Sequence, residues 1–90
     1  MTMAVVWIGP DTGARAVTEE QMTALLRRYA PTGGQLQHLR VRAGPGRSAG
    51  MMIVFGFVNA ETSEQARHTL RTIADTAIAT EPGLRNWRVI

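Results

Sequence analysis

The sequence contains no cysteine, and that absence removes three kinds of chemistry. No disulfide can form, no thiolate can act as a nucleophile, and no zinc site can use sulfur ligands. The sequence also has no run of about 18 apolar residues, the length that a membrane-spanning helix needs. We therefore expect a soluble protein without a membrane partner and without a metal or other cofactor.

Lysine is absent as well, so all ten cationic residues are arginine, against seven acidic ones. The resulting net charge of +3 attracts polyanions only where the arginines gather on one face. Residues 1–3 carry neither the basic segment nor the apolar stretch of a secretory signal, which makes the cytoplasm the expected location. The 90 residues suffice for one hydrophobic core and predict a single domain spanning 1–90.

The first half of the chain predicts a strand, a helix and a second strand. Residues 5–8 form an apolar run that ends at a Gly-Pro turn, as a buried strand does. Thr18 and Gln21 have the spacing of a capping box, and an apolar stripe carries the predicted helix on to Tyr29. Residues 36–43 then alternate as an edge strand, with one side formed by Gln37, Leu39 and Val41 and the other by His38, Arg40 and Arg42.

The second half repeats this plan in the order strand, helix, strand. A glycine-rich hairpin loop over 44–50 leads into a predicted strand over 51–58. This run is so continuously apolar that both faces of the strand must be apolar. A second capping-box spacing begins at Thr62 and opens an amphipathic helix that ends before Pro82. The final strand is predicted over 84–90.

Together these elements predict an α+β, ferredoxin-like βαββαβ sandwich, with two helices on one face of a four-stranded antiparallel sheet. The other face of the sheet is then left open. Even-numbered residues of 52–58 are expected under the helices, where Gly56 permits a close approach, and Phe55 and Phe57 on the open face. On the first strand the same alternation sends Trp7 to the open face.

No catalytic motif emerges from the sequence, which leaves enzyme activity uncertain and favours a non-enzyme. His68 falls opposite the apolar stripe of its helix, as a solvated residue does. His38 is the one candidate acid or base, yet no carboxylate is placed by sequence to orient it. The 44–50 loop lacks the Gly-Lys-Ser/Thr ending and the following helix of a phosphate-binding loop.

Aromatic residues flanked by arginine on an open sheet suit single-stranded nucleic acid, whose bases stack on rings and whose phosphates bind guanidinium groups. Residues 55–58, Phe-Gly-Phe-Val, resemble the centre of the third-strand octapeptide of the RNA recognition motif, and residues 6–9 resemble its first-strand hexapeptide. The resemblance implies that Trp7, Phe55 and Phe57 stack bases. The chain departs from that octapeptide at three positions, Ile53, Val54 and Ala60.

A second hypothesis covers the open face with another copy of the chain. Six apolar side chains there could present on the order of 400 Å². Burying that area on both partners is worth about 20 kcal/mol gross, against an association cost of about 4 to 15 kcal/mol. Face-to-face sheets of this topology are similar to the dimeric α+β barrel family, which includes cofactor-independent monooxygenases, cyclases and isomerases of biosynthetic pathways.

The two hypotheses share one set of contact residues and differ in the ligand. In the first, Trp7, Phe55 and Phe57, with His38, Arg40 and Arg42 beside them, bind single-stranded RNA. In the second, a homodimer encloses a small hydrophobic molecule, and His38 supplies any acid–base chemistry. The sequence leaves open the identity of the ligand, the oligomeric state, the pathway and the strand register near Gly50.

Overall fold

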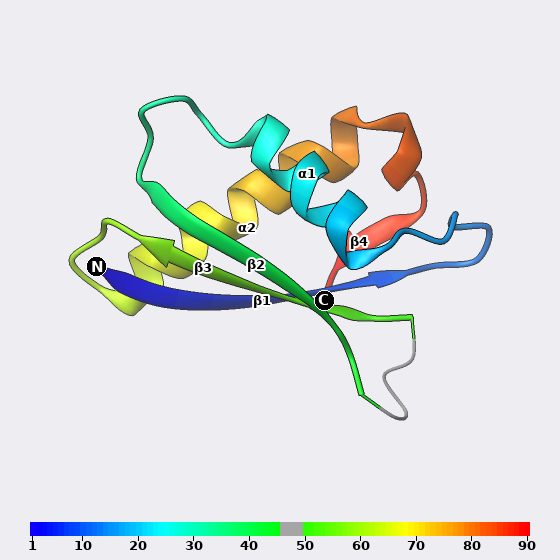
Figure 1. Cartoon of the computed structure of the whole chain (residues 1–90), viewed down its shortest axis with the longest axis horizontal. Coiled ribbons are helices and arrows are strands. Elements are labelled where there is room, and N and C mark those ends of the chain that lie inside the picture. The colour runs from blue at the N-terminus through cyan, green and yellow to red at the C-terminus, as the bar shows by residue number, and fades with distance from the viewer. Residues whose placement is uncertain (46–49) are drawn as a thin grey trace.

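A computed structural model of the chain describes residues 1–45 and 50–90 (Figure 1). In chain order its elements are β1 (Thr2–Pro10), α1 (Glu19–Tyr29), β2 (Leu36–Ala43), β3 (Met52–Val58), α2 (Ser63–Thr80), the short 3-10 helix η2 (Pro82–Leu84) and β4 (Trp87–Val89). Within the described residues, neither helix is both long and apolar enough to cross a membrane.

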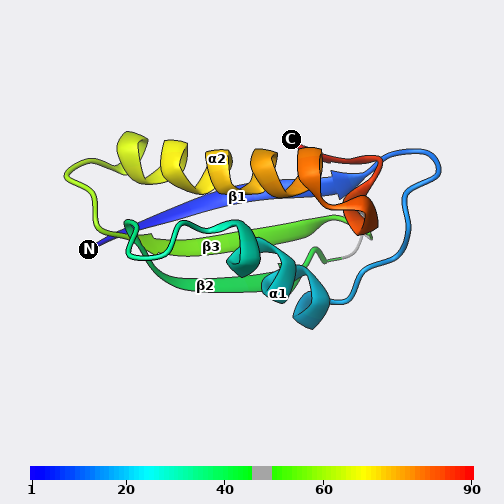
Figure 2. The ribbon, with the colours of Figure 1, turned by 90° about the horizontal axis from the view of Figure 1, so that it is seen from above.

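The four strands form one antiparallel sheet in the order β2-β3-β1-β4. Both helices lie on the same side of that sheet, as the two ribbon views show together (Figures 1 and 2). The fold is the α+β, ferredoxin-like arrangement expected from the sequence, and β2 is an edge strand. We call the sheet side without helices the open face.

Each helix begins directly after a capping threonine, Thr18 for α1 and Thr62 for α2. The Thr18 hydroxyl accepts a hydrogen bond from the Gln21 backbone N–H, and the Gln21 side chain accepts one from the Thr18 N–H, which completes the predicted capping box. Thr62 caps α2 in the same way, but the Gln65 side chain bonds the N–H of Glu61, one residue earlier. Each threonine thus satisfies an N–H that the first helical turn leaves free.

The core lies between the sheet and the helices and follows the predicted alternation. Its largest fully buried side chains come from every layer: Ile8, Met22, Leu26, Leu70, Leu84, Val54 and Val58. Gly56 of β3 is buried directly under α2, and a Cβ atom added there would lie 3.0 Å from Cδ1 of Leu70. The helix therefore approaches the sheet as closely as a residue without a side chain allows.

The alternation predicted for β2 is wrong at its first residues. Leu36 pairs with Val58 and His38 with Phe57, so Gln37 is an extra residue in a β-bulge. Gln37 is exposed, and Leu36 packs against the core in its place. From His38 onward the predicted pattern holds, because the bulge restores the register.

The predicted end of the chain also differs from the structure. Instead of one strand over 84–90, residues Pro82–Leu84 form η2 and only Trp87–Val89 form β4. The turn between them uses Asn86 at φ 68°, a left-handed conformation that asparagine tolerates better than most residues. The central residues 46–49 of the predicted 44–50 hairpin loop lie outside the described residues.

Candidate functional site

The open face is organised in rows that cross the three strands β1, β3 and β2. Directly opposite residues in antiparallel strands share a face and lie in van der Waals reach of each other. The strand register gives three such rows, namely Met3 with Phe57 and His38, Val5 with Phe55 and Arg40, and Trp7 with Ile53 and Arg42. Every residue that the sequence proposed as a contact therefore lies on this one surface.

The three rings occupy successive rows, with Phe57 and Phe55 on β3 and Trp7 on the neighbouring strand β1. Trp7 lies opposite Ile53, one row from Phe55 and two rows from Phe57. Rows on one face are two residues apart, about 7 Å along the strand. Phe55 therefore lies between the other two rings, and a chain of stacked groups could step across the sheet from β3 to β1.

Apolar side chains on the open face are unusually accessible for a small protein. Phe57 is 37% exposed, Met3 53% and Ile90 55%, while Trp7 and Phe55 are partly exposed. A shallow hollow of about 380 Å³ is lined by these apolar groups and by the basic side chains of β2, namely Met3, His38, Arg40, Arg42, Phe55 and Phe57. That volume is near the lower end of small-ligand sites.

Two residues near the carboxyl end extend this surface, and the sequence pattern did not single them out. Arg88 pairs with Gly9 across β1 and β4, which places it on the open face beyond Trp7. The side chain of Ile90 covers Gly9, because a Cβ atom added to Gly9 would lie 2.9 Å from Cδ1 of Ile90. The sequence signal that could have found them is the large apolar side chain of Trp87. If Trp87 is assigned to the core, where the structure places it, strand alternation sends residues 88 and 90 to the opposite face.

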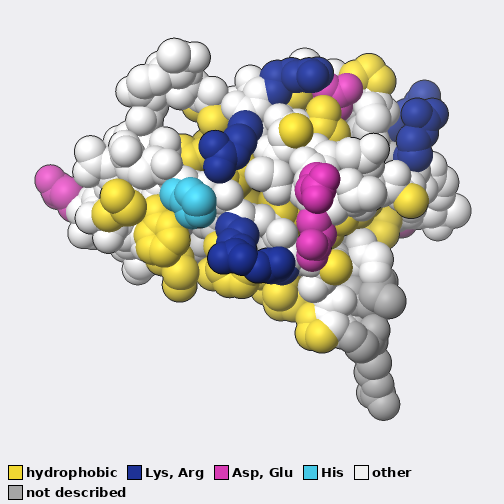
Figure 3. Space-filling model, viewed as in Figure 1, with side chains coloured by type: hydrophobic (Ala, Val, Ile, Leu, Met, Phe, Trp, Pro, Cys, Tyr) yellow, Lys and Arg dark blue, Asp and Glu magenta, His cyan; other side chains and the backbone are white. Residues whose placement is uncertain are grey.

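The ionic side chains that strand pairing places on the open face are arginines, and the carboxylate of Glu19 reaches only the edge of β2, at Ala43. The ion pairs formed among residues 1–45 and 50–90 are Arg28 with Glu81 and Arg71 with Asp75, both on the helix side of the molecule. Arg40, Arg42 and Arg88 take part in neither. Figure 3 shows arginine and histidine side chains along the β2 side of the molecule, directly above a stretch of hydrophobic surface.

The outer edge of β2 is partly covered by α1. Arg27 donates a hydrogen bond to the carbonyl of Leu39 over 3.4 Å, and the carboxylate of Glu19 accepts one from the N–H of Ala43. These side chains occupy backbone groups through which another strand would have to pair. Extension of the sheet at β2 is therefore hindered.

His38 lies beside an aromatic ring and not beside a carboxylate. Its ring centroid is 6.1 Å from that of Phe57, with the planes tilted by 42°. No side-chain hydrogen bond of His38 is formed within the described part of the chain, so nothing there orients the imidazole as the general base of a catalytic pair. The other histidine, His68, is exposed on α2, as expected.

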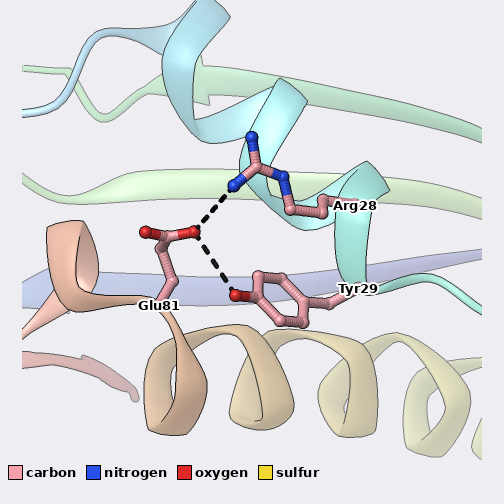
Figure 4. Close-up of polar contacts among 3 residues, drawn as sticks. All are labelled: Arg28, Tyr29 and Glu81. Carbon is pink, nitrogen blue, oxygen red and sulfur yellow. Dashed lines mark hydrogen bonds and ion pairs between the residues drawn. The ribbon is translucent and has the colours of Figure 1, made fainter.

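A polar cluster on the helix side holds the two helices together (Figure 4). Glu81, at the end of α2, accepts hydrogen bonds from Arg28 at 3.1 Å and from the Tyr29 hydroxyl at 3.3 Å. Partial burial of the phenol, the nearby carboxylate charge and this hydrogen bond together raise the pKa of Tyr29, while Arg28 acts in the opposite direction. The cluster is remote from the open face and has a structural role.

Within the residues that the structure describes, no group of three or more His, Cys, Asp or Glu side chains lies close enough together to hold a metal ion.

Comparisons with known protein families, with curated proteins and with solved structures found no match. The resemblance to the RNA recognition motif therefore depends on the residues quoted above and stays a prediction.

Proposed function

We propose that the open face binds single-stranded RNA and that the protein is a non-catalytic binding module. One observation carries the proposal: the rings of Trp7, Phe55 and Phe57 share a surface whose charged side chains are all basic. Such a surface complements a ligand that combines flat, apolar bases with a negative backbone.

The row structure supplies both kinds of contact at each step. Phe55 lies directly beside Arg40, and Phe57 directly beside His38. A base stacked on Phe55 would thus have the guanidinium group of Arg40 in the neighbouring position, where it could bind a phosphate of the same strand. Stacking on an aromatic ring is worth about 1 to 3 kcal/mol per base, and guanidinium groups bind phosphate strongly.

Fluorescence anisotropy with a labelled single-stranded RNA tests the proposal. Phe55→Ala should weaken binding by about 1 to 3 kcal/mol, because one stacking ring is lost. If about two or three phosphates are contacted, log affinity should fall with log salt concentration at a slope of roughly −1.4 to −2. Absent binding, or binding that salt does not affect, would overturn the proposal.

A pair of arginine variants separates the open face from net charge. Arg40→Ala and Arg67→Ala remove the same charge, but Arg67 is exposed on α2, on the helix side. Arg40→Ala should weaken binding and make the salt slope shallower by about 0.7, the contribution of one phosphate contact. Arg67→Ala should leave both nearly unchanged, and equal effects would mean nonspecific attraction.

The exposed aliphatic residues favour a second candidate function. Met3 and Ile90 are each more than half exposed at opposite ends of the face, and neither offers anything to a base or a phosphate. A second copy would cover them in a homodimeric α+β barrel and close the hollow around a hydrophobic small molecule. In that case His38 is the candidate acid or base of a cofactor-independent monooxygenase, cyclase or isomerase.

Native mass spectrometry of the purified protein distinguishes the two candidates, because it reports oligomeric state and retained ligand together. The RNA-binding proposal expects a monomer that takes up RNA. A dimer that retains a small molecule and excludes RNA would favour the barrel, and a monomer at micromolar concentration would exclude it.

A further inference from the structure

The open face offers few groups that could identify a base. The side chains that strand pairing places on this face, with Ile90 directly after β4, are either apolar or basic: Met3, Val5, Trp7, Ile53, Phe55, Phe57 and Ile90, with His38, Arg40, Arg42 and Arg88. Neither amide, hydroxyl nor carboxylate side chains occur among them. The backbone groups of the central strands β1 and β3 are already paired within the sheet.

Base identity is read through matched donors and acceptors. Adenine and cytosine present amino groups, which need an acceptor on the protein, and a specific site places one against them. Guanidinium groups and the indole N–H only donate hydrogen bonds. Among the paired side chains of this face only the neutral form of His38 has an acceptor, so these two bases meet little that distinguishes them.

The side chains of the open face also offer few partners to the 2′-hydroxyl of a ribose. A protein distinguishes RNA from DNA at a site by hydrogen bonds to the 2′-hydroxyl, which is both donor and acceptor. The rings of Phe55 and Phe57 stack equally well under a ribonucleotide or a deoxyribonucleotide, and an arginine contacts the phosphate of either. What remains is stacking and charge, which tolerate every sequence. Guanine is the exception, because its O6 and N7 acceptors match the donors of an arginine.

We infer that the ligand class is a single strand, with little preference among adenine, cytosine, uracil and thymine and little for ribose over deoxyribose. The inference depends on the proposed function and extends it, because it names what the site does not select. It also predicts that single strands bind more tightly than duplexes. The bases of a duplex are stacked on each other and leave no free face for the three rings.

The test measures affinities of the wild-type protein for labelled homopolymers about eight nucleotides long, namely rU, rA, rC, dT and dA, and for a dA–dT duplex. Within each base class, purine or pyrimidine, the affinities for the single strands should agree within about threefold. Purine strands should bind slightly more tightly than pyrimidine strands, because their rings are larger. The duplex should bind at least about tenfold more weakly. Phe55→Ala should weaken binding of every single strand by a similar factor.

Two results would overturn the inference and leave the function intact. One is a single base preferred by more than about tenfold, and the other is RNA preferred over the matched DNA by that factor. If no strand binds at all, the proposed function itself fails. The outcomes are therefore distinguishable within one set of measurements.

Discussion

Phe57 of β3 lies directly across the strand ladder from His38 of β2, and their rings are 6.1 Å apart. The pair joins the aromatic centre of the open face to its basic edge. In the proposed RNA complex His38 would either extend the stacking surface or contact a phosphate. We expect the first role, because the ring of His38 already lies beside that of Phe57.

Substitution of His38 separates these two roles. His38→Ala should weaken RNA binding by about 1 kcal/mol, since part of the stacking surface is removed. His38→Tyr retains an aromatic ring without a charge and should keep nearly the wild-type affinity in anisotropy titrations. A His38→Tyr variant as weak as His38→Ala would show that the imidazole contacts phosphate instead.

If RNA binds as proposed, Arg88 lies at the end of its path beyond Trp7, a position that the sequence pattern did not indicate. Arg88→Ala should weaken binding of strands long enough to pass Trp7 and should make the salt slope shallower by about 0.7. A dinucleotide that reaches only Phe55 and Phe57 should bind the variant and the wild type equally. Equal losses for short and long strands would contradict this path.

Gly56 should tolerate a side chain poorly, because α2 rests on it. Gly56→Ala places a Cβ atom 3.0 Å from Cδ1 of Leu70 and 3.3 Å from Cδ1 of Leu36. Overpacking of this kind lowers the free energy of unfolding by about 1 to 3 kcal/mol, as measured by denaturant titration. Gly83→Ala is a matched control, since its nearest neighbour would be 3.9 Å away, and it should change stability by less than about 0.5 kcal/mol.

Tyr29 is the single tyrosine, so its ionisation can be followed directly by the ultraviolet absorbance of tyrosinate. Partial burial and the Glu81 carboxylate raise its pKa above the ordinary 10.0. In the window between the unfolded and the folded pKa, the unfolded state has already lost a proton that the native state keeps. Stability should therefore fall as pH rises through that window and be unaffected below it.

Two variants check the origin of this shift. Glu81→Gln removes the negative charge, so the Tyr29 titration should move back toward 10.0 in the absorbance measurement. Tyr29→Phe removes the ionisation, and its stability should decline less than that of the wild type above pH of about 10. A Tyr29 pKa that Glu81→Gln leaves unchanged would assign the shift to burial alone.

Local patterns predicted most of the fold because they act over a few residues. The capping box at Thr18 and the cap at Thr62 place both helix starts, since each is satisfied within a single turn. Strict alternation sends Trp7, Phe55 and Phe57 to one side of the sheet as soon as the chain is extended there. These assignments need no knowledge of distant contacts.

Where the pattern misled, a partner distant in sequence decided the conformation. Gln37 leaves the predicted alternation because Leu36, and not Gln37, packs into the core opposite Val58. The final strand is short because η2 buries Leu84, and Trp87 then donates from Nε1 to the carbonyl of Arg15, in a loop 72 residues earlier. No local signal encodes such a contact.

The sequence by itself determined both helices, the first three strands and the side of the sheet that carries the rings, because period and capping are properties of neighbouring residues. Only the tertiary structure decided that Arg40 lies beside Phe55, and that Arg88 and Ile90 complete the surface around Gly9. Register and strand order join residues far apart in the chain, and the packing of the whole sheet against its helices selects them.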